Sequence, residues 1–473
     1  MSRHSVAQLL ILGLLALGPS STQAAEDQLW GQSPYRVLVR VGLSGGPFGD
    51  PATAQEVANQ VRSDLAYRVG SFWRSTVEQG DAEQSLVWEE QLEATDPGRP
   101  DWKPSEEGAP DKVMIATAVY RAGEVVVRAR EYDTTLRIWG KQSSEIAVEP
   151  HQAARGIVTA LLTAFRPLAQ FEVDTDNIQQ VLLNYRGERL AGSSRLIAAN
   201  TGDLLTPYKV KYNRSGQPES AKRVAWTHLQ ATASDDGGAY RADVFSHTRL
   251  PFGSRRRGRV RQLAILIHSD RTQATELRLH AVSDPNTPLV GYELLIGKPG
   301  DREPTSVGRS DTNGRIVAPA SDEVQMAHIK CGSMVVASFP IAPGVDPVLV
   351  APLLDERQRL EAELRIGALR EELIDLVARR SIYAARIRRH LEQGEIKEAE
   401  KLVRQLEALP GRAQFNQRIS NAEQALKADH PVVQKRIDRL LSETKTVLGS
   451  SLDARQVRRL ASEVLEAQRN SGG

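Results

Sequence analysis

The stretch YRVLVRVGL at residues 35–43 leads into the glycine-rich run GLSGGPFGDP at 42–51, and a longer amphipathic stretch follows. Valine alternates with other residues in the first stretch, and this period of two predicts a strand. From Thr53 to Trp73 apolar residues recur at helical spacing, which predicts a helix packed on a sheet. A strand, a turn and a helix in this order indicate a domain that combines α and β structure.

The same domain continues to about residue 171. Residues 96–111 are rich in proline, glycine and charge, which is typical of a loop. Strand-like segments then follow one another as an antiparallel meander at 113–120, 124–131 and 135–148, and a second helix is expected over 151–171. We therefore expect a compact α+β domain over residues 35–171.

Residues 1–24 have the pattern of a secretory signal peptide. Arg3 supplies the positive charge, an apolar run covers 9–17, and small residues occupy 22 and 24. The run is too short to span a bilayer, which takes ~20 apolar residues. The sequence therefore predicts an exported protein, periplasmic or extracellular, with no membrane span in the mature chain. Export disfavours ATP-driven, nucleic-acid-binding and cytosolic metabolic roles.

Composition sets further bounds. A chain of 473 residues is expected to form three or four domains. Its net charge of +2 gives no overall attraction to nucleic acid or to anionic membranes. Cys331 is the only cysteine, so the chain cannot form an internal disulfide. We expect a half-buried structural thiol within a strand, and a cross-link between two chains is the alternative.

After residue 171 the pattern changes to short strand candidates separated by turn residues. Examples are 181–183, 196–198, 208–212 and 240–246, with turn clusters at 214–216 and 235–238 between them. No helical pattern interrupts them, so residues 172–282 are expected to form an all-β domain, either a barrel or a sandwich.

The next segment carries a family resemblance. The sequence TPLVGYEL at 287–294 is followed by VGRSDTNGRI at 307–316, in which Asn313-Gly314 suits a tight turn. Over about 277–345 this pattern resembles the carboxypeptidase regulatory-like, transthyretin-like family. The resemblance implies a β-sandwich, with a hairpin closed by the Asn-Gly turn, and it brings no catalytic residue. We place this second all-β domain at 283–346.

Residues 353–473 read as an all-α domain after a proline-punctuated hinge at 344–352. Apolar residues recur at helical spacing over 355–391, 396–409 and 413–428, a fourth helix opens at Pro431, and Asp453 is expected to cap a last one. The spacing wanders between 3.5 and 3.6 residues, so we expect a helical hairpin or bundle within one chain. A homo-oligomer built through these helices, as in a coiled coil, is the alternative.

The sequence offers no catalytic, cofactor-binding or metal-binding residues. The Gly42–Gly49 turn lies where a phosphate loop would, but it lacks the Gly-Lys-Ser/Thr motif. His228, His247 and His268 fall in the first all-β domain without metal-ligand spacing.

One charge cluster is a candidate contact for an anion or a partner. Arginine side chains bind phosphate and carboxylate groups through paired hydrogen bonds. A solvated loop is the alternative interpretation, and the run at Arg386–Arg389 is interpreted as a solvated helix face. The candidate residues are Arg249, Arg255, Arg256, Arg257, Arg259 and Arg261.

We therefore expect a multidomain mosaic that acts as a non-enzymatic binding or structural protein of the bacterial cell envelope or exterior. Its partner would be an envelope or extracellular protein or an anionic polymer. The alternative is an envelope enzyme, or an accessory subunit of one, with a site in the N-terminal domain near Gly42–Gly49.

Overall fold

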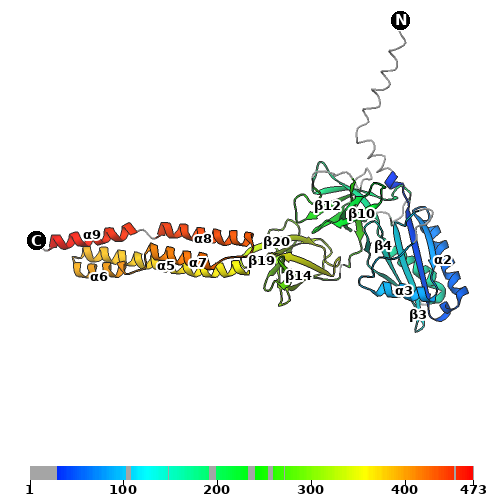
Figure 1. The fold of residues 1–473 in the computed structure, drawn as a ribbon, viewed down its shortest axis with the longest axis horizontal. Helices are drawn as coiled ribbons and strands as arrows, with labels where there is room; N and C mark the ends of the chain where they lie inside the picture. The colour runs from blue at the N-terminus through cyan, green and yellow to red at the C-terminus, as the bar shows by residue number, and fades with distance from the viewer. Residues whose placement is uncertain are drawn as a thin grey trace, which may run out of the picture.

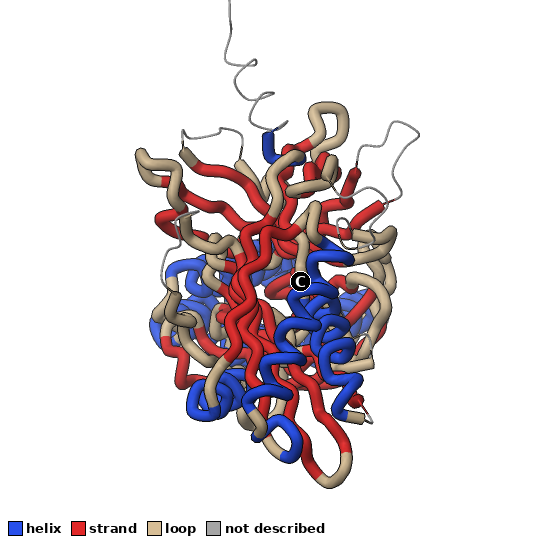
Figure 2. Tube along the Cα trace, turned by 90° about the vertical axis from the view of Figure 1, so that its right-hand side faces the viewer, coloured by secondary structure: helices blue, strands red, loops and turns tan. Residues whose placement is uncertain are grey.

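The chain forms a broad head at its N-terminal side and a long helical rod at its C-terminal side (Figure 1). The computed structural model describes residues 29–102, 108–147, 149–190, 196, 199–232, 240–253, 259–270, 272–451 and 454–471. The expected signal peptide and the expected cap at Asp453 lie outside these residues. Figure 2 views the head from the end opposite the rod, where strands run through the middle with helices packed on them.

The first part of the head is a mixed sheet covered on both faces. Strand β1 (Tyr35–Ser44) lies at its centre and pairs in parallel with two neighbours. The sheet order is β2-β1-β3-β4, and two short strands both pair with β4. The other strands are β2 (Trp73–Gln79), β3 (Lys112–Arg121), β4 (Glu124–Asp133), β5 (Ile138–Trp139) and β6 (Ser143–Ala147).

Helices α2 (Pro51–Val69) and α4 (Ala153–Ala164) contact each other on one face of this sheet, and α3 (Ala82–Glu93) packs on β1 and β3 from the other. Valines 37, 39 and 41 of β1 face the first pair, as their period of two requires. Two short 3₁₀ turns complete this part, η1 (Gly46–Gly49) and η2 (Pro150–Gln152).

The structure corrects the expected elements at two places. Helix α2 ends at Val69, so Trp73 begins strand β2, and α3 follows it. Only two residues of β2 are buried and most of its residues are polar. This edge strand therefore has no alternation of apolar and polar residues from which it could be predicted. The second helix ends at Ala164, and Phe171 lies in a strand, because the chain turns at Pro167 into the next sheet.

The second part of the head is a closed six-stranded barrel, with a seventh strand on its outside. The ring runs β9-β11-β12-β8-β7-β13 and closes where β13 pairs with β9, while β10 pairs with β9 alone. Of the two all-β forms expected here, the structure has the barrel. Its strands are β7 (Leu168–Val173), β8 (Gln180–Tyr185), β9 (Leu204–Tyr212), β10 (Pro218–Arg223), β11 (Thr227–Thr232), β12 (Tyr240–Ser246) and β13 (Val260–Ile267).

Two four-stranded sheets follow and face each other across one core, and we call this unit the sandwich. Strand β14 (Thr275–Ala281) is central in the first, and β16 and β19 are central in the second. Cys331 lies in a strand, as expected, but it is buried in this core and not half-buried. The remaining strands are β15 (Asp284–Pro288), β16 (Glu293–Gly297), β17 (Thr305–Arg309), β18 (Arg315–Ala318), β19 (Gln325–Cys331), β20 (Met334–Ile341) and β21 (Val348–Leu353).

The turn at Asn313-Gly314 differs from the expected hairpin. Gly314 has a positive φ of 71°, and the Asp311 carboxylate accepts hydrogen bonds from the backbone N–H groups of Asn313 and Arg315. However, β17 pairs with β16 and β18 pairs with β14, in the two different sheets. The tight turn therefore carries the chain from one sheet to the other, because each strand finds its partner elsewhere.

The rod is an antiparallel bundle three helices thick. Helix α5 is its longest described helix, about 54 Å at 1.5 Å per residue for 36 residues, and α9 extends past its outer end (Figure 1). The chain returns along it as α6 and α7, and runs outward again as α8 and α9. The helices are α5 (Arg357–Glu392), α6 (Ile396–Glu407), α7 (Arg412–Ala425), α8 (Pro431–Ser451) and α9 (Ala454–Ser471).

The apolar stripes of these helices bury one another in two successive cores. Near the sandwich, Leu373 of α5 packs with residues of α7 and α8, and farther out Ile387 packs with residues of α6 and α9. The chain thus pairs its own stripes over the described residues of the rod. None of the described helices has the length and apolar character needed to cross a membrane.

Candidate functional site

Of the arginines singled out in the sequence, Arg249, Arg259 and Arg261 lie at one end of the barrel, between the end of β12 and the start of β13. Arg255, Arg256 and Arg257 fall outside the described residues. Arg249 is exposed, and Arg261 places its guanidinium 5.1 Å from the ring of Tyr212. The arginines that can be placed are therefore divided between a loop and the barrel wall.

Arg249 lines an open hollow of about 430 Å³ at this rim. The hollow lies between the β7–β8 connection and the end of β12. Its lining combines one arginine with an aspartate, amides and hydroxyls, so it offers mixed polar contacts. The other lining residues are Asp176, Asn177, Ile178, Gln179, Val244, Ser246, His247, Thr248 and Pro251.

The three barrel histidines have separate environments. His228 is buried, and its Nδ1 has no hydrogen-bond partner among the described residues. Burial, with a smaller contribution from Arg223, lowers its pKa to about 4. His247 is exposed at the rim, while His268 Nε2 lies 3.0 Å from the carbonyl oxygen of Phe165. No group of three potential metal ligands forms among the described residues.

The Gly42–Gly49 turn packs against an aromatic ring. Gly45 and Gly46 have positive φ, and a side chain at Gly46 would meet the ring of Tyr120 at 2.3 Å. The turn follows β1, next to the end of β3, at the point where the strand order reverses. Tyr120 thus occupies the space beside this turn, which was the location expected for a site in the alternative interpretation.

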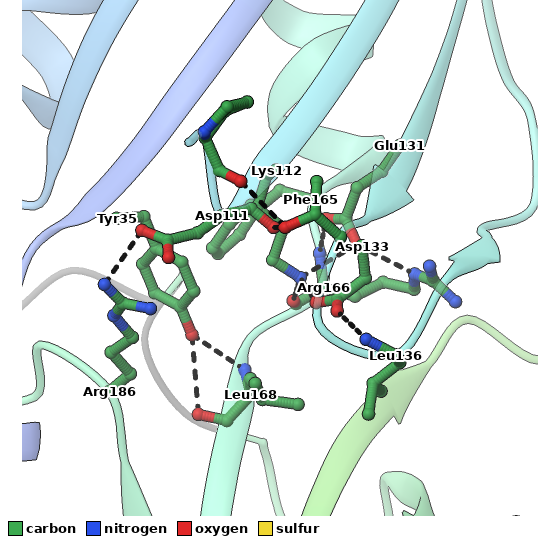
Figure 3. Close-up of polar contacts among 12 residues, drawn as sticks. Tyr35, Asp111, Lys112, Glu131, Asp133, Leu136, Phe165, Arg166, Leu168 and Arg186 are labelled. Atoms are coloured by element: carbon green, nitrogen blue, oxygen red, sulfur yellow. Dashed lines mark hydrogen bonds and ion pairs between the residues drawn. The ribbon is translucent and has the colours of Figure 1, made fainter. Parts of the chain in front are cut away.

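The densest polar arrangement in the head is a buried ionic cluster around Lys112, at the start of β3 (Figure 3). The Lys112 Nζ lies 2.9 Å from Glu131 Oε1 and 2.9 Å from Asp133 Oδ2. It also donates to the backbone carbonyl of Arg166 at 2.7 Å. The Lys112 side chain is 0% exposed and the two carboxylates 0% and 1%. We call Lys112, Glu131, Asp133 and Arg166 the Lys112 cluster.

The Lys112 cluster is balanced in charge and its carboxylates are bonded on both oxygens. Arg166 donates to Glu131 from its backbone N–H at 2.6 Å and from Nε at 3.2 Å. Asp133 accepts the backbone N–H of Leu136 at 2.7 Å. Two cations thus meet two anions, which is the condition under which buried charges are tolerated.

Aromatic rings enclose this cluster and continue into the barrel. The Lys112 ammonium lies 5.6 Å from the ring of Tyr35 and 5.4 Å from that of Phe165. The Tyr35 hydroxyl accepts a hydrogen bond at 2.8 Å from the backbone N–H of Leu168, the first residue of β7. Burial raises the pKa of this hydroxyl, so it remains a neutral donor and acceptor.

A second set of charged residues, next to the Lys112 cluster, connects the first sheet with the barrel. Asp111 accepts from Arg186 Nη2 at 2.8 Å and pairs with Arg36 at 3.3 Å. Arg186 lies between β8 and the following turn of the barrel, and it also donates to the carbonyl of Pro34 at 3.0 Å. One hydrophobic core runs through both parts. The first sheet and the barrel therefore form one packed head.

Sequence reasoning missed the Lys112 cluster, although one signal for it was present. In β4, Val125, Val127 and Ala129 point into the core, and the same alternation continues at Glu131 and Asp133. Charged residues at inward positions of a strand require partners. The identity of those partners depended on β3 lying opposite β4 in the register that pairs Lys112 with Asp133.

The barrel and the sandwich also meet through specific contacts. Arg223 Nη2 donates to Asp346 Oδ2 at 2.8 Å, from β10 to the segment before β21. The rings of Trp226 and Phe339 lie 4.3 Å apart. Leu204 and Val324 belong to a small apolar cluster shared by the two units.

The sandwich meets the rod through a third set of buried charges, which we call the rod joint. Arg359 of α5 is 2% exposed and donates to Glu356 at 2.6 Å and to the carbonyl of Cys331 at 2.7 Å. Glu356 is 0% exposed and also pairs with Arg436 of α8. Tyr292 accepts the backbone N–H of Glu356 at 2.9 Å. Arginines from two helices thus converge on the Glu356 carboxylate, while the Glu356 backbone and Arg359 are hydrogen-bonded to the sandwich.

No family model and no curated protein sequence matches this chain. Among solved structures, it is similar to TolB from Acinetobacter baumannii at 10% identity, over 66% of this chain and 83% of that one, with a TM-score of 0.16. It is also similar to the Bacillus anthracis TIE protein at 9% identity, over 46% of this chain and 63% of that one, with a TM-score of 0.15. TM-scores this low carry no conclusion about fold or function.

Proposed function

We propose that this protein is an exported, non-enzymatic structural and binding protein of the bacterial cell envelope or exterior. In this proposal the head presents a binding surface, and the rod holds that surface at a set distance from whatever its far end contacts. Export rests on the signal-peptide pattern of residues 1–24.

The observation that carries the proposal is where the chain places its buried charges. The Lys112 cluster lies where the first sheet meets the barrel, and the rod joint lies where the sandwich meets the rod. Burying an ion costs several kcal/mol unless partners compensate it, and in this proposal the buried charges fix the orientation of the units that they join. Charges at junctions suit a molecule whose units must keep a fixed orientation.

The binding surface in this proposal is the barrel rim at Arg249. Loops held by a rigid scaffold are common binding sites. An anionic group of an envelope polymer or protein would suit the exposed guanidinium, and the neighbouring amides and hydroxyls of the hollow would add hydrogen bonds. The partner would then be held by the head and not altered by it.

Rigidity at the rod joint can be measured in the full chain by pulsed electron paramagnetic resonance. Spin labels are placed at Val317→Cys in the sandwich and Ile374→Cys in α5, both at exposed positions, with the buried Cys331 replaced by Ala. We expect one narrow distance distribution. Glu356→Ala should broaden it, whereas Glu361→Ala, which removes an exposed carboxylate one turn farther along α5, should not. A broad distribution in the parent protein would contradict a rigid spacer.

Export is tested separately in cells that produce the full chain. Mass spectrometry of the protein from periplasmic and medium fractions should find a mature N-terminus close after residue 24. Intact protein retained in the cytoplasm with its leader uncut would contradict the proposed location.

A further inference from the structure

The arginines of α5 change their partners along the rod. From the sandwich outward, each of the first five pairs with a carboxylate, and Arg380 donates to the carbonyl of Pro410. Beyond this point no carboxylate partner is found, among the described residues, for Arg386, Arg388 or Arg389, and all three are exposed. The paired arginines are Arg357, Arg359, Arg365, Arg370 and Arg379.

The other two helices at this end add cations of the same kind. Lys397 lies in the first turn of α6, directly after the turn that ends α5. Arg469 lies near the end of α9. The neighbouring Gln468 donates a hydrogen bond to Glu400 of α6 at 3.0 Å, so Arg469 lies at the same level of the rod as the start of α6. Both cations are exposed and have no ion pair among the described residues. We call Arg386, Arg388, Arg389, Lys397 and Arg469 the basic tip.

Two carboxylates at this end already have partners. Glu395 lies 2.6 Å from His390, and Glu398 pairs with Lys401 at 3.8 Å. Arg386, Arg388 and Arg389 lie on an exposed helix face, as interpreted from the sequence, but have no ion-pair partner among the described residues. Glu392 at the end of α5 and Glu466 of α9 are exposed and have no ion pair among the described residues, so five such cations stand against two such anions and the tip has an excess of positive charge.

We propose that the basic tip binds a surface of phosphate-bearing anionic lipid headgroups. The cations come from three helices around the end of a rod, so an extended array of phosphates meets several of them at once. Arginine pairs with phosphate through two hydrogen bonds. Leu465, which is 58% exposed one turn before Arg469, adds an aliphatic group of the kind that enters the headgroup region. This inference goes beyond the proposed function and does not depend on it, since it uses the rod alone.

The test is co-sedimentation of the full chain with phosphatidylcholine vesicles that contain or lack phosphatidylglycerol. We expect binding only to the anionic vesicles and weakening with salt. Because a cation near an anionic surface contributes about 1 kcal/mol, each lost charge should lower the partition coefficient about five-fold. The variant R386Q/R388Q/R389Q should therefore bind about 100-fold more weakly.

The matched control removes three exposed, ion-paired arginines nearer the sandwich, as R365Q/R379Q/R418Q. It changes the net charge equally and should bind like the parent. A second tip variant, K397E/R469E, should also lose binding, with its helical content checked by circular dichroism. The proposal is overturned if the parent ignores anionic vesicles, or if the control loses as much binding as the tip variants. Binding to a soluble polyanion such as dextran sulfate without binding to vesicles would also overturn it.

Discussion

Lys112 and Asp133 stand opposite each other in the antiparallel register of β3 and β4, and their side chains meet at 2.9 Å with almost no exposure to solvent. Glu131 lies two residues earlier on the same face of β4 and completes the contact with the ammonium. The contact between these charges therefore depends on the register of the two strands. A slip of one residue in this hairpin would turn both carboxylates away from the lysine.

Replacing Lys112 by methionine should destabilise the head strongly. Glu131 and Asp133 would lose their shared cation while still buried, and breaking a buried pair in this way costs about 3–5 kcal/mol. Urea unfolding followed by tryptophan fluorescence measures the change. Lys141→Met, which removes a half-exposed cation 3.6 Å from Asp270, should cost less than about 1 kcal/mol. Equal effects of the two variants would contradict the assigned role of the cluster.

The buried His228 should make the protein less stable in mild acid. The pKa of the His228 imidazole is about 4 in the folded protein and about 6.5 in the unfolded chain. Above pH 6.5 the imidazole is therefore neutral in both states. Between pH 6.5 and 4 only the unfolded state takes up the proton, which removes at most about 3 kcal/mol as the pH falls. The free energy of unfolding should therefore drop less between pH 7.5 and pH 5 in His228→Gln than in the parent, and an identical drop would refute the assignment.

The thiol of Cys331 should be slow to react. It is buried in the sandwich core, and burial raises its pKa, so little thiolate is present or accessible. Iodoacetamide labelling at pH 8, read by mass spectrometry, should be slow in the native chain and complete in denaturant. Val335→Cys, at a 51% exposed position on neighbouring β20, is the control and should label rapidly. Fast labelling of the native Cys331 would show that the core opens readily.

The same substitution should have opposite effects at two alanines. Ala122 has a φ of 52° in the turn between β3 and β4, where a side chain costs about 1–2 kcal/mol, so Ala122→Gly should stabilise the head by about 1 kcal/mol. Ala385 is exposed inside α5, where glycine costs about 1 kcal/mol relative to alanine. Denaturation curves of the two variants should shift in opposite directions. A loss of stability in Ala122→Gly would contradict the strain at this turn.

Truncating the rod core should loosen the helices around it. Ile437 of α8 is fully buried between α5 and α7, and isoleucine to alanine in such a site costs about 2–5 kcal/mol. Faster hydrogen exchange is expected at the amides of these helices and not at those of the barrel. Val447→Ala removes a 47% exposed side chain from the same helix and should leave the exchange rates nearly unchanged.

The succession of structural types could be predicted from local periodicity. Alternating valines placed β1, helical spacing placed α2 and the rod helices, and turn residues separated the barrel strands, because these signals come from which face of each element is buried. The missed elements are β2, which has only two buried residues, and α3, whose buried positions have helical spacing but include Ser85 and Glu89 and so leave no clear apolar pattern. The position of Arg249 beside the hollow at the barrel rim could not be predicted from composition.

By itself, the sequence determined the order of the units, the lack of internal disulfides and the apolar stripes that the helices must bury. Only the tertiary structure decided which charges meet. Lys112 finds its carboxylates because β3 and β4 pair in one register, and Glu356 gathers arginines from two helices because α8 returns beside α5. Local patterns record that a residue is buried, whereas its partner depends on long-range pairing that no short stretch of sequence contains. The cations of the basic tip follow the same rule, since no ion-pair partner lies beside them among the described residues.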